Sequence, residues 1–239
     1  MCTKCPFSSG QLQPDRFSGG QLDKSAVNGA SDVPYEFPNI LVDYVMTNTK
    51  VPVGWWRSVY NSQNGFANEG FLDELAHIAG EDPYQFRVKL LKNSPRHLGV
   101  LDLAAKKAGW GTKLGKGRGR GIAVHESFGS WAAHVAEVTV GINGNFTIDR
   151  VVAAIDCGLA VHPDGIRMQM ESGIVYGLTS TLKGEITIKK GAVEQSNFHE
   201  FELLQIDETP EMEIHIVDSS EPPGGAGEPG LPPVAPAVA

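Results

Sequence analysis

The sequence has few cysteines, no long apolar run and no excess of basic residues, and each absence excludes a class of protein. Only 3 of the 239 residues are Cys, too few to organise a fold through disulfides. No apolar stretch approaches the roughly 20 residues that a transmembrane helix needs. The 20 Lys and Arg residues are outnumbered by 28 Asp and Glu, which gives a formal net charge of -8. This balance disfavours nucleic-acid binding, because a phosphate backbone requires a basic surface.

The amino-terminal residues lack the apolar core of a secretory signal, since Cys2, Lys4 and Cys5 lead into a mainly polar stretch. We therefore expect a soluble protein without a membrane span, in the cytoplasm or the periplasm. Cys2 and Cys5 form a C-x-x-C pair that is either incidental or part of a metal site. A zinc or iron–sulfur site needs further ligands nearby, and Cys157 is distant in sequence. We expect no metal held directly by protein side chains.

Three segments of different composition define the expected domain organisation. Residues 1–38 are interrupted by Gly or Pro every few positions, which predicts irregular chain. Residues 39–113 combine one strand with helices, and residues 114–239 combine strands with a helix. Because helices come first and mixed strands and helices follow, the predicted fold class is α+β.

The middle segment carries one strand signal and three helix signals. Residues 40–47 are rich in β-branched and aromatic side chains, which predicts a strand. Helices are expected over 64–78, from Asp82-Pro83 onward, and over 98–108. Glycines 80 and 109 are expected to end the first and third. The apolar residues expected on the buried side of the first helix are Phe66, Phe71, Leu72, Leu75 and Ile78.

The last segment starts with a basic, glycine-rich stretch at 114–120, which is either a solvated connector or a phosphate site and does not fit the P-loop pattern. Asn143-Gly144 is a strong hairpin signal. A helix is expected over 164–182, where Gly173 and Gly177 indicate close approach to another backbone. Its predicted buried face comprises Ile166, Met170, Ile174 and Leu178. Strands are expected at 121–124, 132–142, 146–156, 185–189, 192–194 and 212–217.

A glycine-rich stretch near the carboxyl end surrounds a single carboxylate. Gly225, Ala226 and Gly227 precede Glu228, and Pro229 follows it. Glycine lets backbone N–H groups approach a ligand closely, and proline holds the preceding residue in an extended conformation. A carboxylate held beside exposed amides suits a general base. On composition alone, a flexible Pro/Gly tail is the alternative.

Two other clusters leave alternatives open. His125-Glu126-Ser127 is either the end of a strand or part of a substrate pocket, because adjacent strand residues point to opposite faces. Trp55 and Trp56 are either core residues or the lining of a pocket.

The stretch around Glu228 resembles the catalytic-glutamate loop of the molybdenum hydroxylases, the xanthine dehydrogenase and aldehyde oxidoreductase family. The resemblance is strongest to large (beta) subunits of the isoquinoline 1-oxidoreductase type and runs from about residue 23 to residue 239. Ser172 stands where the family usually has a glycine. The matching motifs, in chain order, are Gly54-Trp55-Trp56-Arg57-Ser58-Val59, Gly119 to Gly129, Ile155-Asp156-Cys157-Gly158, His162-Pro163, Gln169-Met170-Glu171-Ser172-Gly173, Gly177-Leu178 and Gly225-Ala226-Gly227-Glu228-Pro229.

The resemblance implies the carboxy-terminal, molybdopterin-binding part of a catalytic subunit. Such enzymes hydroxylate N-heterocycles or oxidise aldehydes with oxygen from water, and Glu228 would be the general base. The family also implies a small-molecule substrate, molybdenum on molybdopterin in the cytosine dinucleotide form, and 2Fe-2S clusters on a partner subunit. The residues implied to contact the cofactor are Trp56, Arg57, Gly225, Ala226 and Gly227.

The chain also departs from the family. The catalytic subunits of the family are far longer than this chain, and the Gly-Gln-Gly segment that binds the pterin in the family has no counterpart in this sequence. We therefore expect the remainder of the large subunit as a partner. The alternative is a truncated or non-catalytic fragment, or an assembly subunit, that binds no cofactor alone.

Overall fold

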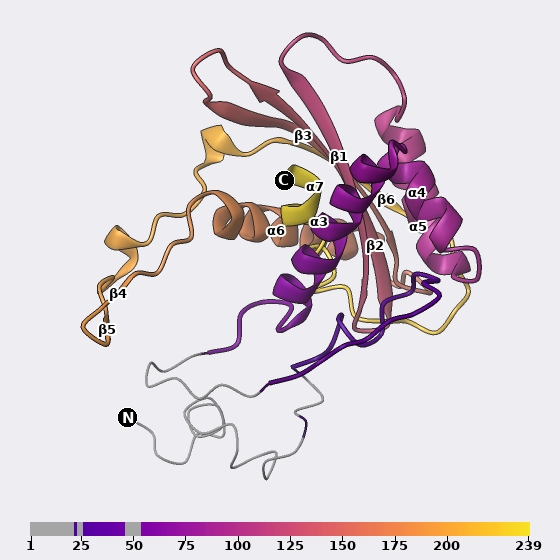
Figure 1. The fold of residues 1–239 in the computed structure, drawn as a ribbon, viewed down its shortest axis with the longest axis horizontal. Helices are drawn as coiled ribbons and strands as arrows, with labels where there is room; N and C mark the ends of the chain where they lie inside the picture. Colours follow the sequence, from indigo (N-terminus) through magenta and orange to yellow (C-terminus); the bar gives the residue numbers. More distant parts are fainter. Residues whose placement is uncertain (1–21, 23–25, 46–53) are drawn as a thin grey trace.

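The computed structural model describes residues 22, 26–45 and 54–239, and a four-stranded sheet forms its centre (Figure 1). The strand order is β1-β2-β3-β6; the first three strands are antiparallel, and β6 is parallel to β3. The strands are β1 (Arg118–Ser127), β2 (Ser130–Val140), β3 (Phe146–Asp156) and β6 (Glu211–Ile216). The helices are α3 (Asn61–Ala79), α4 (Pro83–Leu90), α5 (Pro95–Ala108), α6 (Pro163–Leu182) and α7 (Val234–Val238).

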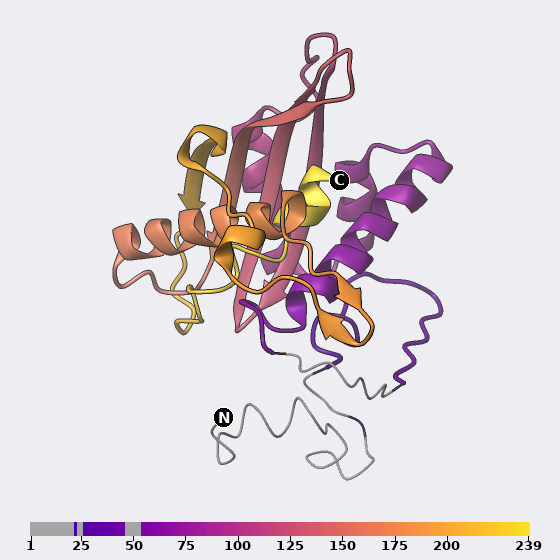
Figure 2. The same ribbon diagram turned by 90° about the vertical axis from the view of Figure 1, so that its left-hand side faces the viewer.

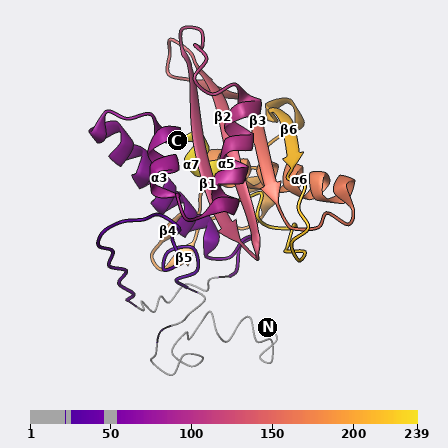
Figure 3. The same ribbon diagram turned by 90° about the vertical axis from the view of Figure 1, so that its right-hand side faces the viewer.

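Alternate residues of each strand point to opposite faces of the sheet, and each face has its own apolar core. Ile122 and Val124 pack on the face that α5 covers, whereas Ala123 packs on the face that α6 and α7 cover. Figure 3 shows α5 lying along the sheet, and Figure 2 shows α6 crossing the other face. The predicted α+β class is confirmed.

Local signals place most helix ends and the main hairpin where the structure has them. Gly80 and Gly109 end α3 and α5 in the left-handed conformation, and Asp82 caps the first turn of α4. The Asn143-Gly144 turn joins β2 to β3, with φ of 85° at Gly144. These features depend on a few neighbouring residues, so the sequence reveals them.

The helix predicted over 164–182 is α6, and its buried face is the predicted one. A Cβ atom on Gly173 would lie 3.1 Å from the carbonyl carbon of Gly230, and one on Gly177 would lie 3.1 Å from Val234 Cβ. The predicted close approach of another backbone is therefore confirmed, and that backbone is the segment that follows Glu228. The buried apolar residues are Ile166, Met170, Ile174 and Leu178.

Helix α3 forms as predicted but faces the core with a different side. The expected burial of Phe66, Phe71 and Ile78 is wrong, because all three are exposed. The buried residues are Asn61, Gly65, Glu69, Leu72 and Ala76. Apolar periodicity therefore selects the wrong side of this helix, because its packing is decided by a buried charge.

That charge is the carboxylate of Glu69, which is 2% exposed. It accepts hydrogen bonds from the Arg87 Nε atom at 2.9 Å, the Tyr35 hydroxyl at 2.5 Å and the Val124 amide at 2.9 Å. An unpaired buried charge is costly, so these partners fix α3 against α4 and against the edge strand β1. The open edge of β1 is thereby covered at Val124.

Two further predictions are wrong. Residues 40–45 are not a strand: they are mostly exposed and pair with no strand in the described part of the chain, and 46–47 lie outside it. A β-branched segment needs a partner to become a strand. The stretch 114–120 is not all connector, because β1 begins at Arg118. Arg118 and Arg120 form ion pairs with the buried Glu137 at 3.2 and 2.9 Å.

The segment between α6 and β6 holds less strand than expected. It carries a small two-stranded sheet that lies away from the main sheet (Figure 1). Both strands are shorter than predicted because only two pairs of residues face each other. The elements of this segment are β4 (Ile188–Lys189), β5 (Ala192–Val193) and the 3-10 turns Phe198–Glu200 and Ile206–Glu208.

The structure bears differently on the predictions about membrane spans, cysteines and domain boundaries. No helix among the described residues is long and apolar enough to cross a membrane. Cys157 is buried as expected, whereas Cys2 and Cys5 lie outside the described residues. The division into 1–38, 39–113 and 114–239 stays a prediction, and α5 from the middle segment packs on strands of the last.

Two buried histidines predict acid sensitivity of the fold. Burial lowers the pKa of His134 to about 3, and burial together with the nearby His125 and Arg96 charges lowers that of His97 to about 4. Since both values lie below the usual value near 6.5, folding favours the neutral rings, and this stability is lost as the pH falls below 6.5. We expect the free energy of unfolding, measured with urea, to drop by about 2 kcal/mol per histidine between pH 7 and pH 5.

The variant His134→Gln removes one titrating ring and should flatten the pH dependence by about 2 kcal/mol over the same range. His77→Gln, at an exposed position of α3, is the matched control and should leave the slope unchanged. An unchanged slope in His134→Gln would contradict the assignment.

Candidate active site

The glycine-rich stretch before Glu228 is a loop fixed by main-chain hydrogen bonds. The Gly224 amide donates to the Cys157 carbonyl and the Gly225 amide to the Phe128 carbonyl, both at 2.8 Å. The packing leaves no space at Gly224, where a Cβ atom would lie 2.2 Å from the Gly129 carbonyl oxygen. The stretch is therefore a defined loop against the ends of β1 and β3, not a flexible tail.

Three main-chain donors beside Glu228 have no hydrogen-bond acceptor among the described residues. Within the described residues, the amides of Ala226, Gly227 and Glu228 donate to no carbonyl or side chain. Successive unpaired N–H groups attract anionic and oxo groups. The Gly225 amide donates to the Phe128 carbonyl, so the unpaired amides belong to the next three residues. They fit a group that carries oxygen atoms with negative charge.

The carboxylate of Glu228 is half-buried and is held from one side. Its Oε1 atom accepts a hydrogen bond from the Ser58 amide at 2.9 Å, and its carbonyl oxygen accepts one from the Ser58 hydroxyl at 2.7 Å. In the described part of the chain, Oε2 has no hydrogen-bond donor. One oxygen thus fixes the side chain while the other stays available for a proton, which is the arrangement that a general base requires.

The turn that presents Ser58 has unusual backbone geometry. Ser58 has φ of 71° and the next residue, Val59, has φ of 51°. The left-handed region is disfavoured for side chains that branch at Cβ, such as Val, so the surroundings must hold the turn. Ser58 itself is fully buried. No sequence pattern assigns a role to Ser58, because its contact with Glu228 spans 170 residues and depends on this turn.

Arg57 joins the two loops that the sequence predicts to flank the cofactor. Its Nε and Nη2 atoms both donate to the Gly227 carbonyl, with Nε at 2.9 Å. Its Nη1 atom donates to the Ser172 hydroxyl at 2.9 Å, and Nη2 donates to Gln169 Oε1 at 3.1 Å. The guanidinium therefore holds the loop of Glu228 against α6. Bonds to a planar cation in several directions also fix the orientation of the group.

The Trp56 ring lies beside this arginine and stacks on Tyr176 of α6, with ring centroids 4.6 Å apart. The Arg57 guanidinium is 5.9 Å from the same Tyr176 ring. Trp55 is 58% exposed. Of the two alternatives for the tryptophans, a place in the core is therefore excluded for Trp55.

Sequence reasoning assigned no role to Tyr176, although a signal for it existed. Gln169, Ser172 and Tyr176 are spaced i, i+3 and i+7, so they share one side of α6. This side faces Arg57 and Trp56. The buried apolar residues of α6 form a different side of the helix. A second side with polar and aromatic residues was therefore a signal in the sequence for a contact at this site.

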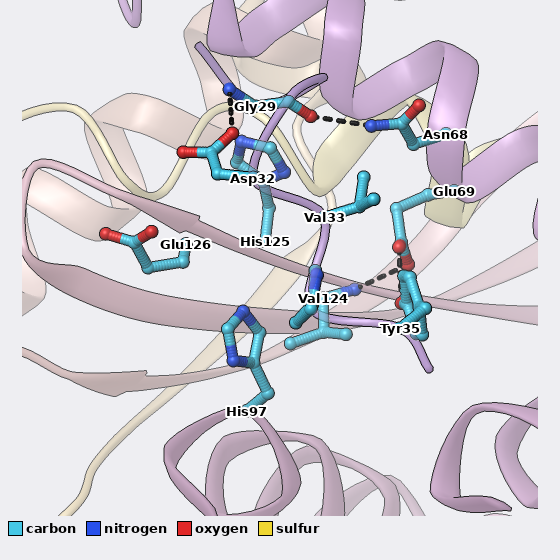
Figure 4. A pocket seen from close by; sticks show the side chains of 11 residues that line it. Gly29, Asp32, Val33, Tyr35, Asn68, Glu69, His97, Val124, His125 and Glu126 are labelled. Atoms are coloured by element: carbon cyan, nitrogen blue, oxygen red, sulfur yellow. Dashed lines mark hydrogen bonds between the residues drawn. The ribbon is translucent and has the colours of Figure 1, made fainter. Parts of the chain in front are cut away.

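His125-Glu126-Ser127, the motif that looked like a catalytic constellation in the sequence, makes no hydrogen bond to Glu228 within the described residues. His125 is buried on β1 and lines a small cavity with Asp32, His97 and Glu126 (Figure 4). The cavity measures about 20 Å³, which is room for a water molecule and not for an organic substrate. Burial lowers the pKa of His125 and raises that of Glu126.

No group of His, Cys, Asp or Glu in the described residues is arranged to hold a metal ion. The unpaired amides of Ala226, Gly227 and Glu228 lie on the loop that Arg57 holds, next to the Glu228 carboxylate.

Comparisons with known proteins point to one family. A family profile described as molybdopterin cofactor-binding domain matches residues 97–210. The chain is 30% identical over 210 residues to the beta subunit of isoquinoline 1-oxidoreductase from Brevundimonas diminuta, covering 86% of this chain and 27% of that protein. It is 31% identical over 228 residues to a subunit of nicotinate dehydrogenase from Pseudomonas putida, covering 86% of this chain and 19% of the relative.

A solved structure agrees in fold. Quinoline 2-oxidoreductase from Pseudomonas putida 86 superposes with a TM-score of 0.68 at 11% identity, over 78% of this chain and 49% of that one. The chain spans about a quarter or less of the length of the two curated relatives.

The Arg57 clamp predicts a local loss of stability on substitution. In Arg57→Lys the single ammonium group cannot replace the donors that reach Gly227, Gln169 and Ser172 together. Because the site is partly exposed, we expect the free energy of unfolding to fall by about 1–2 kcal/mol, measured with urea at pH 7. The loop of Glu228 should also become more sensitive to limited proteolysis.

Arg167→Lys is the matched control, since Arg167 lies on the exposed side of α6 and pairs only with Asp164 among the described residues. It should change stability by less than about 0.5 kcal/mol. Equal effects of the two substitutions would show that Arg57 is not a clamp.

Proposed function

Since this chain belongs to the molybdopterin cofactor-binding proteins of the molybdenum hydroxylase family, we propose that it forms the part of a catalytic subunit that carries the general base, Glu228. The assembled enzyme would hydroxylate N-heterocycles or oxidise aldehydes with water as the source of oxygen. The observation that carries the proposal is the Glu228 carboxylate, held through Oε1 by the Ser58 amide beside three unpaired main-chain donors of the described chain.

The residues of this chain have separate tasks in the proposal. The amides of Ala226, Gly227 and Glu228 would help to hold the cofactor through hydrogen bonds to its oxygen atoms. Arg57 keeps the loop in place by holding the Gly227 carbonyl, and its side chain and that of Trp56 close the site from the other loop. When bound, molybdenum on molybdopterin supplies the two-electron redox chemistry that side chains lack.

Glu228 supplies the proton transfer. Its Oε2 atom, which has no donor among the described residues, would take a proton from the water-derived oxygen when the cofactor is bound. Because Ser58 fixes Oε1, the carboxylate is oriented before the substrate arrives. A positioned base of this kind contributes about 10² to 10⁴ in rate.

The finer parts of the proposal rest on the family. The names of the two curated relatives refer to isoquinoline and nicotinate, both N-heterocycles, which favours that class of substrate. We further propose the cytosine dinucleotide form of the cofactor, a small subunit with 2Fe-2S clusters, and the remainder of the large subunit as partners. Both relatives are named as single subunits of their enzymes, which supports a multi-subunit assembly.

Co-expression of the chain with the products of its neighbouring genes tests the proposal. The purified complex is assayed for molybdenum by mass spectrometry and for dye-linked oxidation of N-heterocycles and aldehydes. In Glu228→Gln we expect kcat to fall by about 10² to 10⁴ with the molybdenum content unchanged, because the amide cannot take the proton.

Glu221→Gln is the matched control, because this exposed glutamate lies on the same segment and its side chain makes no hydrogen bond within the described structure. It should keep its activity. A complex without molybdenum would overturn the proposal and favour a fragment that binds no cofactor. Full activity in Glu228→Gln would overturn the assignment of the base.

A further inference from the structure

The strained turn at Ser58 and Val59 must be held from both ends for Ser58 to keep Glu228 in place. Arg57, which directly precedes the turn, donates hydrogen bonds to Gly227 in the loop of Glu228 and to Ser172 of α6. On the other side, the Asn61 amide donates to the Ser58 carbonyl at 3.0 Å. Asn61 begins α3 and is 6% exposed. Whatever fixes Asn61 therefore fixes the turn.

The partner of Asn61 is a histidine of the central sheet. The Asn61 side-chain oxygen lies 3.0 Å from His125 Nε2, and both residues are buried. An amide oxygen only accepts, so Nε2 carries the proton and donates it. Because His125 belongs to β1, which is paired along its length with β2, the turn is tied to the central sheet.

The ring of His125 packs closely against two glycines. A Cβ atom on Gly65 would lie 3.2 Å from His125 Nδ1, and one on Gly29 would lie 2.8 Å from its Cε1 atom. The same Gly65 Cβ would lie 3.4 Å from Pro232, four residues after Glu228. Figure 4 shows the ring beside Gly29 at the upper end of the cavity. Two glycines thus make the space that holds the ring against α3.

We propose that His125 is a positioning residue for Glu228, acting through Asn61 and the strained Ser58–Val59 turn. The chain of contacts runs from His125 Nε2 to the Asn61 side chain, from the Asn61 amide to the Ser58 carbonyl, and from the Ser58 amide to Glu228 Oε1. In this role His125 acts through its hydrogen bond to Asn61 and not on the reacting atoms. The proposal rests on the proposed function for its catalytic meaning but not for its geometry.

Amide hydrogen exchange at Ser58, measured by NMR on the full chain without cofactor, tests the geometry. In His125→Leu the donor is lost at similar volume, so the Ser58 amide should exchange about tenfold faster, while the Val135 amide inside the sheet stays protected. His125→Gln keeps a donor for Asn61 and should restore exchange to within about threefold of the wild type. A purely structural role would not separate these two variants in this way.

The same variants are then compared in the assembled enzyme. We expect kcat to fall about tenfold in His125→Leu with KM unchanged, and His125→Gln to recover it. If His125→Leu does not fold, Asn61→Ala removes the same bond from the other side and should speed Ser58 exchange equally. Ser58 exchange within about threefold of the wild type in a folded variant that lacks the bond would overturn the proposal. If Ser58 exchange responds as expected but the complex holds no molybdenum, the proposed function fails and the positioning role stands.

Discussion

The buried carboxylate of Glu69 is the constraint on which the site depends. A charge at 2% exposure must be fully paired, and its partners come from three separate parts of the chain: Tyr35, Arg87 and Val124. The hydrogen bonds to these three partners orient α3 across the edge of β1. The side of α3 that carries small and polar residues therefore faces the interior. The first residue of α3, Asn61, then lies against His125. Burying Phe66 and Phe71 instead would leave this charge without partners.

The position of α3 decides what its preceding turn can do. The turn brings the Ser58 amide to Glu228, and Arg57 spans from the turn to Gly227 and to α6. Segments more than 100 residues apart in sequence meet at a single guanidinium group. The Gly173–Gly230 contact holds the chain just after Glu228 from the opposite side. The loop of Glu228 is thus supported by helices and a sheet edge, and its glycines serve close packing.

Features that depend on near neighbours could be predicted, and features that depend on distant charge could not. The helix ends at Gly80 and Gly109 and the hairpin at Asn143-Gly144 follow from local backbone preferences. The buried face of α6 follows from apolar spacing because apolar contacts hold it. Periodicity misidentified the buried side of α3 because an ion pair, not apolar area, orients that helix. The β-branched residues 40–45 lack a partner strand in the described chain, and pairing is not a local property.

Residue identity and order alone were enough to establish the fold class, the family and the residues that stand in its motifs, including Arg57 and Glu228. Such motifs need no knowledge of contacts. The folded molecule was needed to show that Ser58 holds Glu228, that Arg57 binds Gly227 and that His125 serves Asn61. Each of these is a hydrogen bond between residues at least 64 positions apart. Its formation depends on how helices and strands pack, so no local pattern in the sequence records it.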